Sequence, residues 1–93
     1  MNVERIRRRL LISGRVQGVW FRGAMERQAA LLGATGWVRN LPDGRVEAVV
    51  EGSADVVNRM TEWCHHGPPG AAVTGVMASS EPAEGFDNFD IRY

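Results

Sequence analysis

The segment from Gly14 to Arg22, GRVQGVWFR, combines several groups that could bind an anion. A helical pattern opens at about Phe21, yet residues 14–20 contain no Ser, Thr, Asp or Asn to cap it. Arg22 places a positive charge in the first turn, where the helix dipole is already positive. Gly14 and Gly18 leave the loop free to turn its backbone N–H groups inward. An anion would satisfy all of these groups, so the segment predicts a phosphate site.

A second candidate, Asn40, follows in the segment GWVRN. Side chains alternate along a strand, so Val38 and Asn40 share one face, which we expect to be the core face. An Asn beside a turn usually serves the turn. Here Pro42 and the pair Asp43-Gly44 already supply turn residues, which leaves Asn40 available for another role. Its amide can both donate to and accept from a water molecule, and could therefore orient a nucleophile.

The order of predicted elements must bring these two segments together. Strands are expected at about 5–13, 35–40, 45–51, 73–80 and 86–93. One helix is expected over 21–32, with Phe21, Met25 and Ala29 on its buried face, and a second after the N-cap Ser53. This order predicts an α+β fold, a ferredoxin-like βαββαβ sandwich with a short extra C-terminal strand. We expect an antiparallel sheet with both helices on one face.

Composition limits the classes of function. The 93 residues are expected to form one domain, 1–93, and 44% of them are hydrophobic. Eleven basic and eleven acidic residues give zero net charge, which argues against a general nucleic-acid binder. Cys64 is the only cysteine, so no internal disulfide can form. With no signal peptide or membrane span recognised, we expect a cytoplasmic protein that does not bind membranes. His65 and His66 are interpreted as surface residues, and no metal site is predicted.

Two longer patterns identify a family resemblance. Residues 14–22 match G-R-V-Q-G-V-x-[FY]-R, and residues 36–52 match G-[FYW]-V-[KR]-N-x3-G-x-V-x5-G. Both are signatures of the acylphosphatase family, and the resemblance extends over essentially the whole chain. Two long patterns in the right order are far more specific than one glycine-rich loop.

The resemblance implies hydrolysis of the carboxyl-phosphate bond of small acyl phosphates, without metal or cofactor. It implies that Arg22 binds the phosphate and that Asn40 orients the attacking water. The phosphate cradle would be formed by consecutive backbone N–H groups, those of Gln17, Gly18, Val19, Trp20, Phe21 and Arg22. Inorganic phosphate or sulfate would compete for this cradle. Several relatives carry a hydroxyl residue where this chain has Leu41, so no auxiliary hydrogen bond is expected there.

Two other functions are compatible with a ferredoxin-like fold. A nucleic-acid-binding module would stack bases on aromatic side chains of its central strands, but the first strand has none. A phosphate-sensing module without catalysis would keep the loop and lack turnover. We expect a monomeric enzyme whose partner is a small acyl phosphate, with no nucleic acid bound.

Overall fold

The chain forms seven elements in a computed structural model that describes residues 4–93. In order they are β1 (Ile6–Arg15), α1 (Phe21–Leu32), β2 (Thr35–Asn40), β3 (Val46–Gly52), α2 (Ala54–Cys64), β4 (Ala72–Glu81) and β5 (Phe89–Arg92). The predicted order and both helices are confirmed, and two strand ends differ. β1 continues through Gly14 and Arg15, because a bulge after Ser13 lets these residues still pair with β4. β5 begins at Phe89, later than expected.

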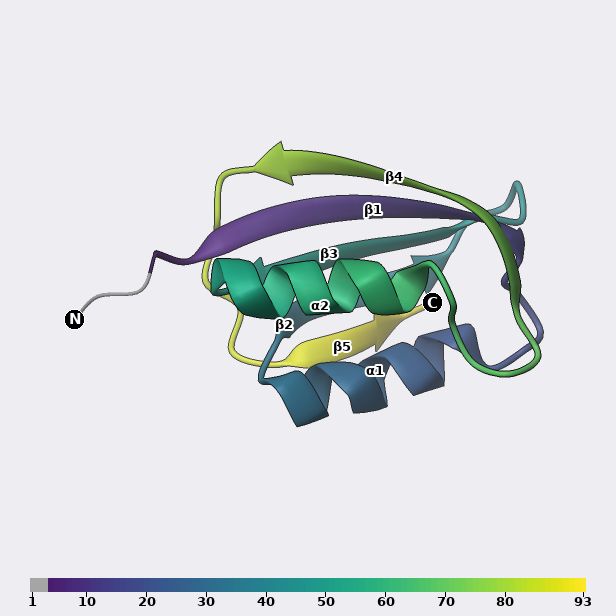
Figure 1. The fold of residues 1–93 in the computed structure, drawn as a ribbon, viewed down its shortest axis with the longest axis horizontal. Coiled ribbons are helices and arrows are strands. Elements are labelled where there is room, and N and C mark those ends of the chain that lie inside the picture. Colours follow the sequence, from purple (N-terminus) through teal and green to yellow (C-terminus); the bar gives the residue numbers. More distant parts are fainter. Residues whose placement is uncertain (1–3) are drawn as a thin grey trace.

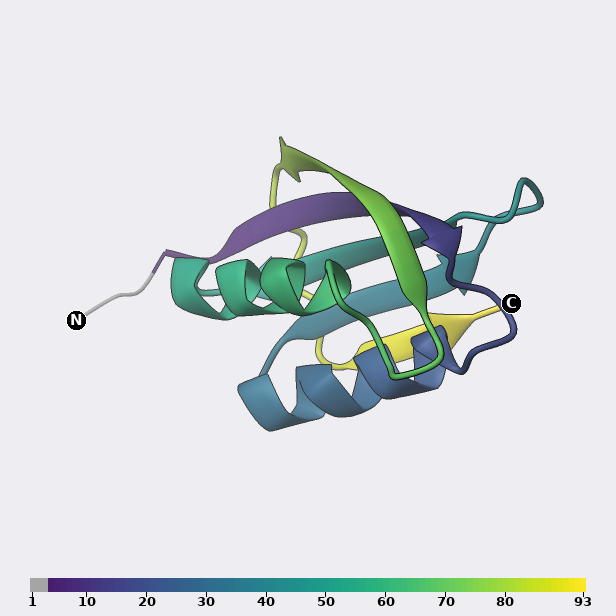
Figure 2. The same cartoon turned by 45° about the vertical axis from the view of Figure 1, so that its right-hand side comes forward.

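The strands form one sheet in the order β4-β1-β3-β2-β5. Figures 1 and 2 show α1 and α2 lying side by side on the same face of this sheet. Within residues 4–93 the opposite face carries no helix. The predicted ferredoxin-like sandwich with two helices on one face and a C-terminal strand is therefore confirmed.

The expectation of a purely antiparallel sheet is wrong, because the sheet is mixed. β1 pairs antiparallel with β3 and β4, and β2 pairs antiparallel with β3. β5 pairs parallel with β2. The chain reverses direction after β4, which runs opposite to β1, so β5 runs in the same direction as β1 and β2. When β5 then joins the far edge of the sheet beside β2, the pairing has to be parallel.

The core lies between the sheet and the helices. Leu10, Ile12, Val38, Ala48 and Val50 are fully buried on the covered sheet face. The helices contribute a second set of buried side chains, among them Phe21, Met25, Ala29, Val57, Met60 and Cys64. Burial raises the pKa of the Cys64 thiol, so this cysteine behaves as a small apolar residue. The predicted alternation along β2 is confirmed at Val38.

The two helices begin differently. In α2 the Ser53 hydroxyl accepts a hydrogen bond from the Val56 N–H at 3.3 Å, and Asp55 lies in the first turn. In α1 the cap position is Trp20, no side chain caps the helix, and the first turn contains no acid. The defect predicted for α1 is thus present beside a helix that follows the ordinary rules. Neither helix is long and apolar enough to span a bilayer within residues 4–93.

Candidate active site

The loop between β1 and α1 is anchored in the core at both of its ends. Val16 is 1% exposed and Phe21 is 2% exposed. The Phe21 ring packs edge-on against Trp63, with 5.3 Å between the ring centroids. Because both ends are fixed by apolar packing, the intervening backbone is held in place although its N–H groups make no hydrogen bonds to residues 4–93.

The backbone N–H groups of this loop have no protein acceptor. None of the N–H groups of residues 17–22 donates a hydrogen bond within the part of the chain that the structure describes. Gly18 has φ 75° and Trp20 has φ 66°, and this left-handed geometry turns the loop into the first turn of α1. Unpaired N–H groups at the positive end of a helix dipole attract an anion.

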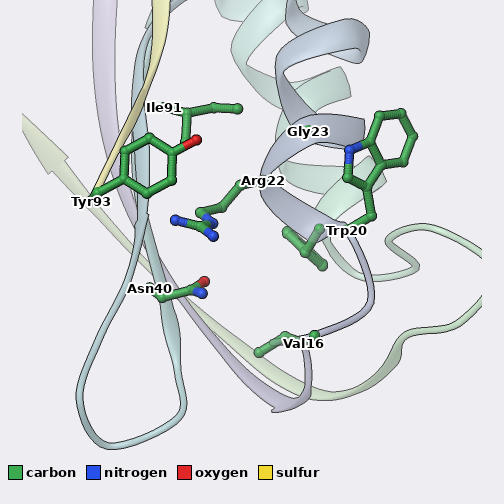
Figure 3. A pocket seen from close by; sticks show the side chains of 9 residues that line it. Val16, Trp20, Arg22, Gly23, Asn40, Ile91 and Tyr93 are labelled. Carbon is green, nitrogen blue, oxygen red and sulfur yellow. The ribbon is translucent and has the colours of Figure 1, made fainter.

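A pocket of about 190 Å³ opens beside this loop (Figure 3). This volume is several times the roughly 30 Å³ that one water molecule occupies in the liquid. Its walls come from the loop, from α1, from the end of β2 and from β5, and consist of Val16, Gly18, Trp20, Phe21, Arg22, Gly23, Asn40, Ile91 and Tyr93. The structure therefore brings together Arg22 and Asn40, which lie 18 residues apart in the sequence, and four of the six predicted loop residues. The other two, Gln17 and Val19, do not line the pocket.

The Arg22 guanidinium projects into the pocket without a counter-charge. No carboxylate of residues 4–93 lies within ion-pair distance of it. Its neighbours are the Arg92 carbonyl, 3.5 Å from Nη1, and the Tyr93 ring, whose centroid lies 4.8 Å from Cζ. Figure 3 shows the guanidinium between Tyr93 and Asn40. A guanidinium held in this way retains donors for an oxyanion.

Asn40 lies at the last position of β2, and its side-chain amide has no hydrogen-bond partner among the described residues. The following turn closes without it. The Gly44 N–H donates to the Leu41 carbonyl at 3.1 Å, and the Asp43 carboxylate accepts from the Arg45 N–H at 3.0 Å. The expectation that residues 42–44 supply the turn is confirmed, and the Asn40 amide is left to face the pocket (Figure 3).

Gln17 connects the loop to the hairpin that carries Asn40. Its side-chain Nε2 donates to the Leu41 carbonyl at 2.8 Å and to the Arg45 carbonyl at 3.0 Å. From the sequence, only the backbone N–H of Gln17 was expected to take part in the site. The sequence shows a long amide side chain in a glycine-rich loop, which indicates that it can form hydrogen bonds. It does not indicate which carbonyls accept them, because that depends on how the strands pack.

The contribution of β5 to the pocket was not predicted from the sequence. Ile91 and Tyr93 line the pocket, and Arg92 contacts Arg22. These residues reach the pocket because β5 pairs with β2, Arg39 lying opposite Arg92. The strand itself was predicted, but its neighbour in the sheet was not.

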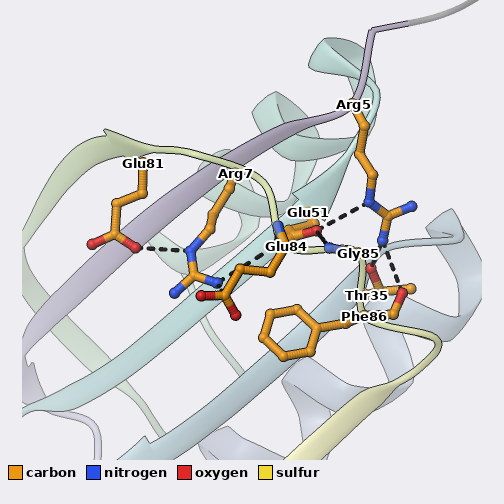
Figure 4. Close-up of polar contacts among 8 residues, drawn as sticks. All are labelled: Arg5, Arg7, Thr35, Glu51, Glu81, Glu84, Gly85 and Phe86. Atoms are coloured by element: carbon orange, nitrogen blue, oxygen red, sulfur yellow. Dashed lines mark hydrogen bonds and ion pairs between the residues drawn. The ribbon is translucent and has the colours of Figure 1, made fainter.

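A buried carboxylate, Glu51, fixes the segment that leads to β5 (Figure 4). Its side chain is 0% exposed and lies outside the pocket. It accepts hydrogen bonds from the N–H groups of Glu84 and Gly85, at 2.8 and 2.9 Å, and from Arg5 Nε at 3.0 Å. Burial alone would raise the pKa of Glu51, but these donors outweigh burial and lower it to about 2. Glu51 is therefore an ionised structural anchor.

The residues expected to lie on the surface do so. His66 pairs with Glu62 on the exposed side of α2, at 3.3 Å, and His65 is exposed as well. No group of three or more His, Cys, Asp or Glu side chains is placed to hold a metal ion in residues 4–93.

The fold is that of a small α+β protein, and its pocket lies at a helix N-terminus beside an arginine and unpaired backbone N–H groups. Residues 8–91 match the family model described as acylphosphatase. The acylphosphatase of Rubrobacter xylanophilus is 58% identical over 85 residues, covering 90% of this chain and 77% of the relative. The acylphosphatase of Anaeromyxobacter dehalogenans is 50% identical over 91 residues, which cover 97% of this chain and 98% of the relative.

Solved structures agree with these sequence relatives. The acylphosphatase from Coxiella burnetii has a TM-score of 0.91 at 40% identity, covering 95% of this chain and 93% of that one. The acylphosphatase from Bacillus subtilis has a TM-score of 0.91 at 35% identity, and the match covers 95% of this chain and 99% of that one. The chain belongs to the acylphosphatase family. Both the family resemblance and the prediction of a hydrolase are confirmed.

Proposed function

We propose that this chain hydrolyses small acyl phosphates to a carboxylate and inorganic phosphate, with Arg22 binding the phosphate and Asn40 orienting the attacking water. One observation carries the proposal. An uncompensated guanidinium, a loop of unpaired N–H groups and an unpartnered amide meet in a single pocket. Among residues 4–93 the guanidinium lacks a counter-charge and the N–H groups and the amide lack partners, and a phosphate with its attacking water would supply all three.

The reaction needs little covalent help from the protein. The water oxygen forms a bond to phosphorus as the bond from phosphorus to the acyl oxygen breaks, and the carboxylate leaves with the electron pair. A carboxylate is a stable leaving group, so no strong general acid is required. The water proton passes to a phosphate oxygen. Positioning and charge stabilisation supply the catalysis, and the Arg22 fork can hold two phosphoryl oxygens at once.

The two side chains have separable roles. Arg22 contacts the phosphate before and during reaction, so Arg22→Ala weakens both phosphate binding and turnover. Arg22→Lys keeps the charge but loses the planar fork, and activity falls severely. Asn40 contacts the water, so Asn40→Ala lowers kcat by about 10²–10³-fold, the scale for one aligned polar group, with phosphate affinity and stability little changed.

A steady-state assay with acetyl phosphate tests these roles, with the inhibition constant of inorganic phosphate as the measure of binding. Arg59→Ala and Asn58→Ala, both on the exposed side of α2, are matched controls that leave both quantities unchanged. If Asn40→Ala unfolds the protein, Asn40 is a turn determinant. If it weakens phosphate binding as much as Arg22→Ala does, Asn40 is a phosphate ligand and the water is oriented by another group.

The same assay separates catalysis from the alternatives. A phosphate-sensing module would bind phosphate without turnover. A nucleic-acid module would need an accessible aromatic platform, but Trp37 on the uncovered sheet face is only 9% exposed. The guanidinium carbons of Arg39 and Arg92 lie 5.5 and 4.6 Å from the centre of its ring. Because these two arginines cover the Trp37 ring, a base could not stack on it, and this supports the enzyme over the nucleic-acid-binding module.

A further inference from the structure

The contacts that orient the Arg22 guanidinium come from the end of β5. Within residues 4–93 its hydrogen bond goes to the Arg92 carbonyl, 3.5 Å from Nη1, and its cation–π contact is with the Tyr93 ring, 4.8 Å from Cζ. The Tyr93 side chain is 98% exposed, so packing against the rest of the protein does little to fix it. The orientation of Arg22 therefore depends on where the backbone at the end of β5 lies.

The end of β5 is weakly held by the sheet itself. This strand has four residues and lies at the edge of the sheet, where β2 is its one neighbour in the strand order (Figure 1). Its pairing with β2 ends with Arg92 opposite Arg39. Like charges directly opposite each other destabilise a strand pair. Other contacts of these two side chains must compensate for the repulsion.

Trp37 supplies that compensation on the uncovered face of the sheet. It shares this face with Arg39, and the guanidinium carbons of Arg92 and Arg39 lie 4.6 and 5.5 Å from the centre of its ring. Arg39 is also held by Glu47, whose Oε1 lies 2.5 Å from its Nε. Arg92, in contrast, has no carboxylate within ion-pair distance among the described residues. The Trp37 ring is therefore the contact that holds the Arg92 side chain.

We propose that Trp37 is a positioning residue for phosphate binding. Its ring holds Arg92 on the uncovered face, and the Arg92 carbonyl and the Tyr93 ring in turn hold the Arg22 guanidinium in the pocket. Trp37 does not line the pocket, so it acts through Arg22 and not on the phosphate. The orientation matters because a guanidinium binds two phosphoryl oxygens only when its planar fork faces them. This inference rests on the proposed function, in which Arg22 binds phosphate, and adds the residue that orients it.

Titration of the protein with inorganic phosphate in a calorimeter measures this effect without turnover. Trp37→Leu keeps an apolar side chain and removes the aromatic face, so phosphate binding weakens about three- to tenfold, the scale of one cation–π contact. Trp37→Phe keeps an aromatic face and stays within about twofold of the native affinity.

A double-mutant cycle tests the path from Trp37 through Arg92 to Arg22. Arg92→Gln removes the cation and keeps the backbone carbonyl, and it also weakens phosphate binding. Trp37→Leu then costs less than about twofold when added to Arg92→Gln or to Arg22→Ala, because the contact it breaks no longer orients a phosphate ligand. The Arg92 side chain is exposed, so Arg92→Gln tests the inference even if Trp37→Leu is too unstable to titrate.

A variant of reduced stability serves as the matched control. Leu11 is a half-buried side chain on the same face of the sheet, on β1, which β3 separates from β2. Leu11→Ala lowers Tm and leaves phosphate affinity unchanged, with all titrations done below the lowest Tm. If Leu11→Ala weakens phosphate binding as much as Trp37→Leu does, the effect is a general loosening of the fold and the inference is wrong.

The inference and the proposed function fail in different ways. Native phosphate affinity in Trp37→Leu or in Arg92→Gln, or an undiminished effect of Trp37→Leu in the Arg92→Gln background, overturns the positioning role and leaves the role of Arg22 intact. Native phosphate affinity in Arg22→Ala overturns the proposed function of Arg22, and the positioning role falls with it.

Discussion

Replacing Gln17 with methionine would test whether the hairpin must be tied to the loop for catalysis. The substitution keeps the length of the side chain and removes the two hydrogen bonds to the carbonyls of Leu41 and Arg45. Both carbonyls retain a second donor, since the Gly44 N–H binds the Leu41 carbonyl and the Leu41 N–H binds the Arg45 carbonyl. Neither oxygen is therefore left without a partner.

The expected loss of stability follows from that geometry. Two hydrogen bonds of about 0.5–1.5 kcal/mol each are lost, with no added cost for an unsatisfied carbonyl, so Gln17→Met destabilises the fold by about 2 kcal/mol. For a chain of this size Tm falls by roughly 10 °C. The larger effect is on kcat. With the hairpin released, Asn40 moves relative to Arg22, and a shift of about 1 Å at a reacting centre can lower the rate by about 10²-fold.

A double-mutant cycle decides whether the effect passes through Asn40. Steady-state kcat is measured for the native chain, Gln17→Met, Asn40→Ala and the double variant, below the lowest Tm. If Gln17 acts by positioning Asn40, Gln17→Met costs about 10- to 100-fold in the native background and less than about threefold when Asn40 is already alanine. Equal losses in both backgrounds would refute the reasoning and place the role of Gln17 in the phosphate loop alone.

Three further outcomes are expected. Activity survives EDTA, because residues 4–93 provide no cluster of metal ligands; loss on chelation and recovery with a divalent ion would contradict this. The pKa of Glu51 falls from 4.5 to about 2 on folding, so its contribution of about 3 kcal/mol is complete above pH 4.5 and is lost as the pH falls through 2. Urea titrations from pH 6 to pH 2 should show this loss in the native chain, and Glu51→Gln should lack that part of the slope. Gly23→Ala displaces the Trp20 indole, which should shift the tryptophan fluorescence; an unchanged spectrum would show that the ring has room to spare.

Local features of the fold could be predicted from the sequence because they depend on neighbouring residues. The periodicity of apolar side chains located α1 at Phe21–Leu32, and the missing cap at its start pointed to the loop. The alternation around Val38 placed Asn40 on the side of the core. Each of these inferences needed only a few consecutive positions.

The remaining part of the site depends on strand order, which local patterns do not determine. Nothing in the residues of β5 indicates that it joins the edge beside β2 rather than the edge beside β4. The parallel pairing and the contact of Arg22 with Arg92 and Tyr93 both follow from that choice. The same limit applies to Gln17, whose acceptors lie 24 and 28 residues further along the chain.

The position of the pocket explains how the chain tolerates a helix start that breaks the ordinary rules. Arg22 and the strained Trp20 both destabilise the first turn of α1. Val16 and Phe21, on either side of Trp20, are buried among apolar side chains that hold the turn in place. An anion in the pocket would relieve the repulsion between Arg22 and the helix dipole and would pair the free N–H groups. Phosphate should therefore raise Tm in a concentration-dependent way. In Arg22→Ala that increase should be smaller while the unliganded protein is no less stable, because the substitution removes the repulsion together with the binding group.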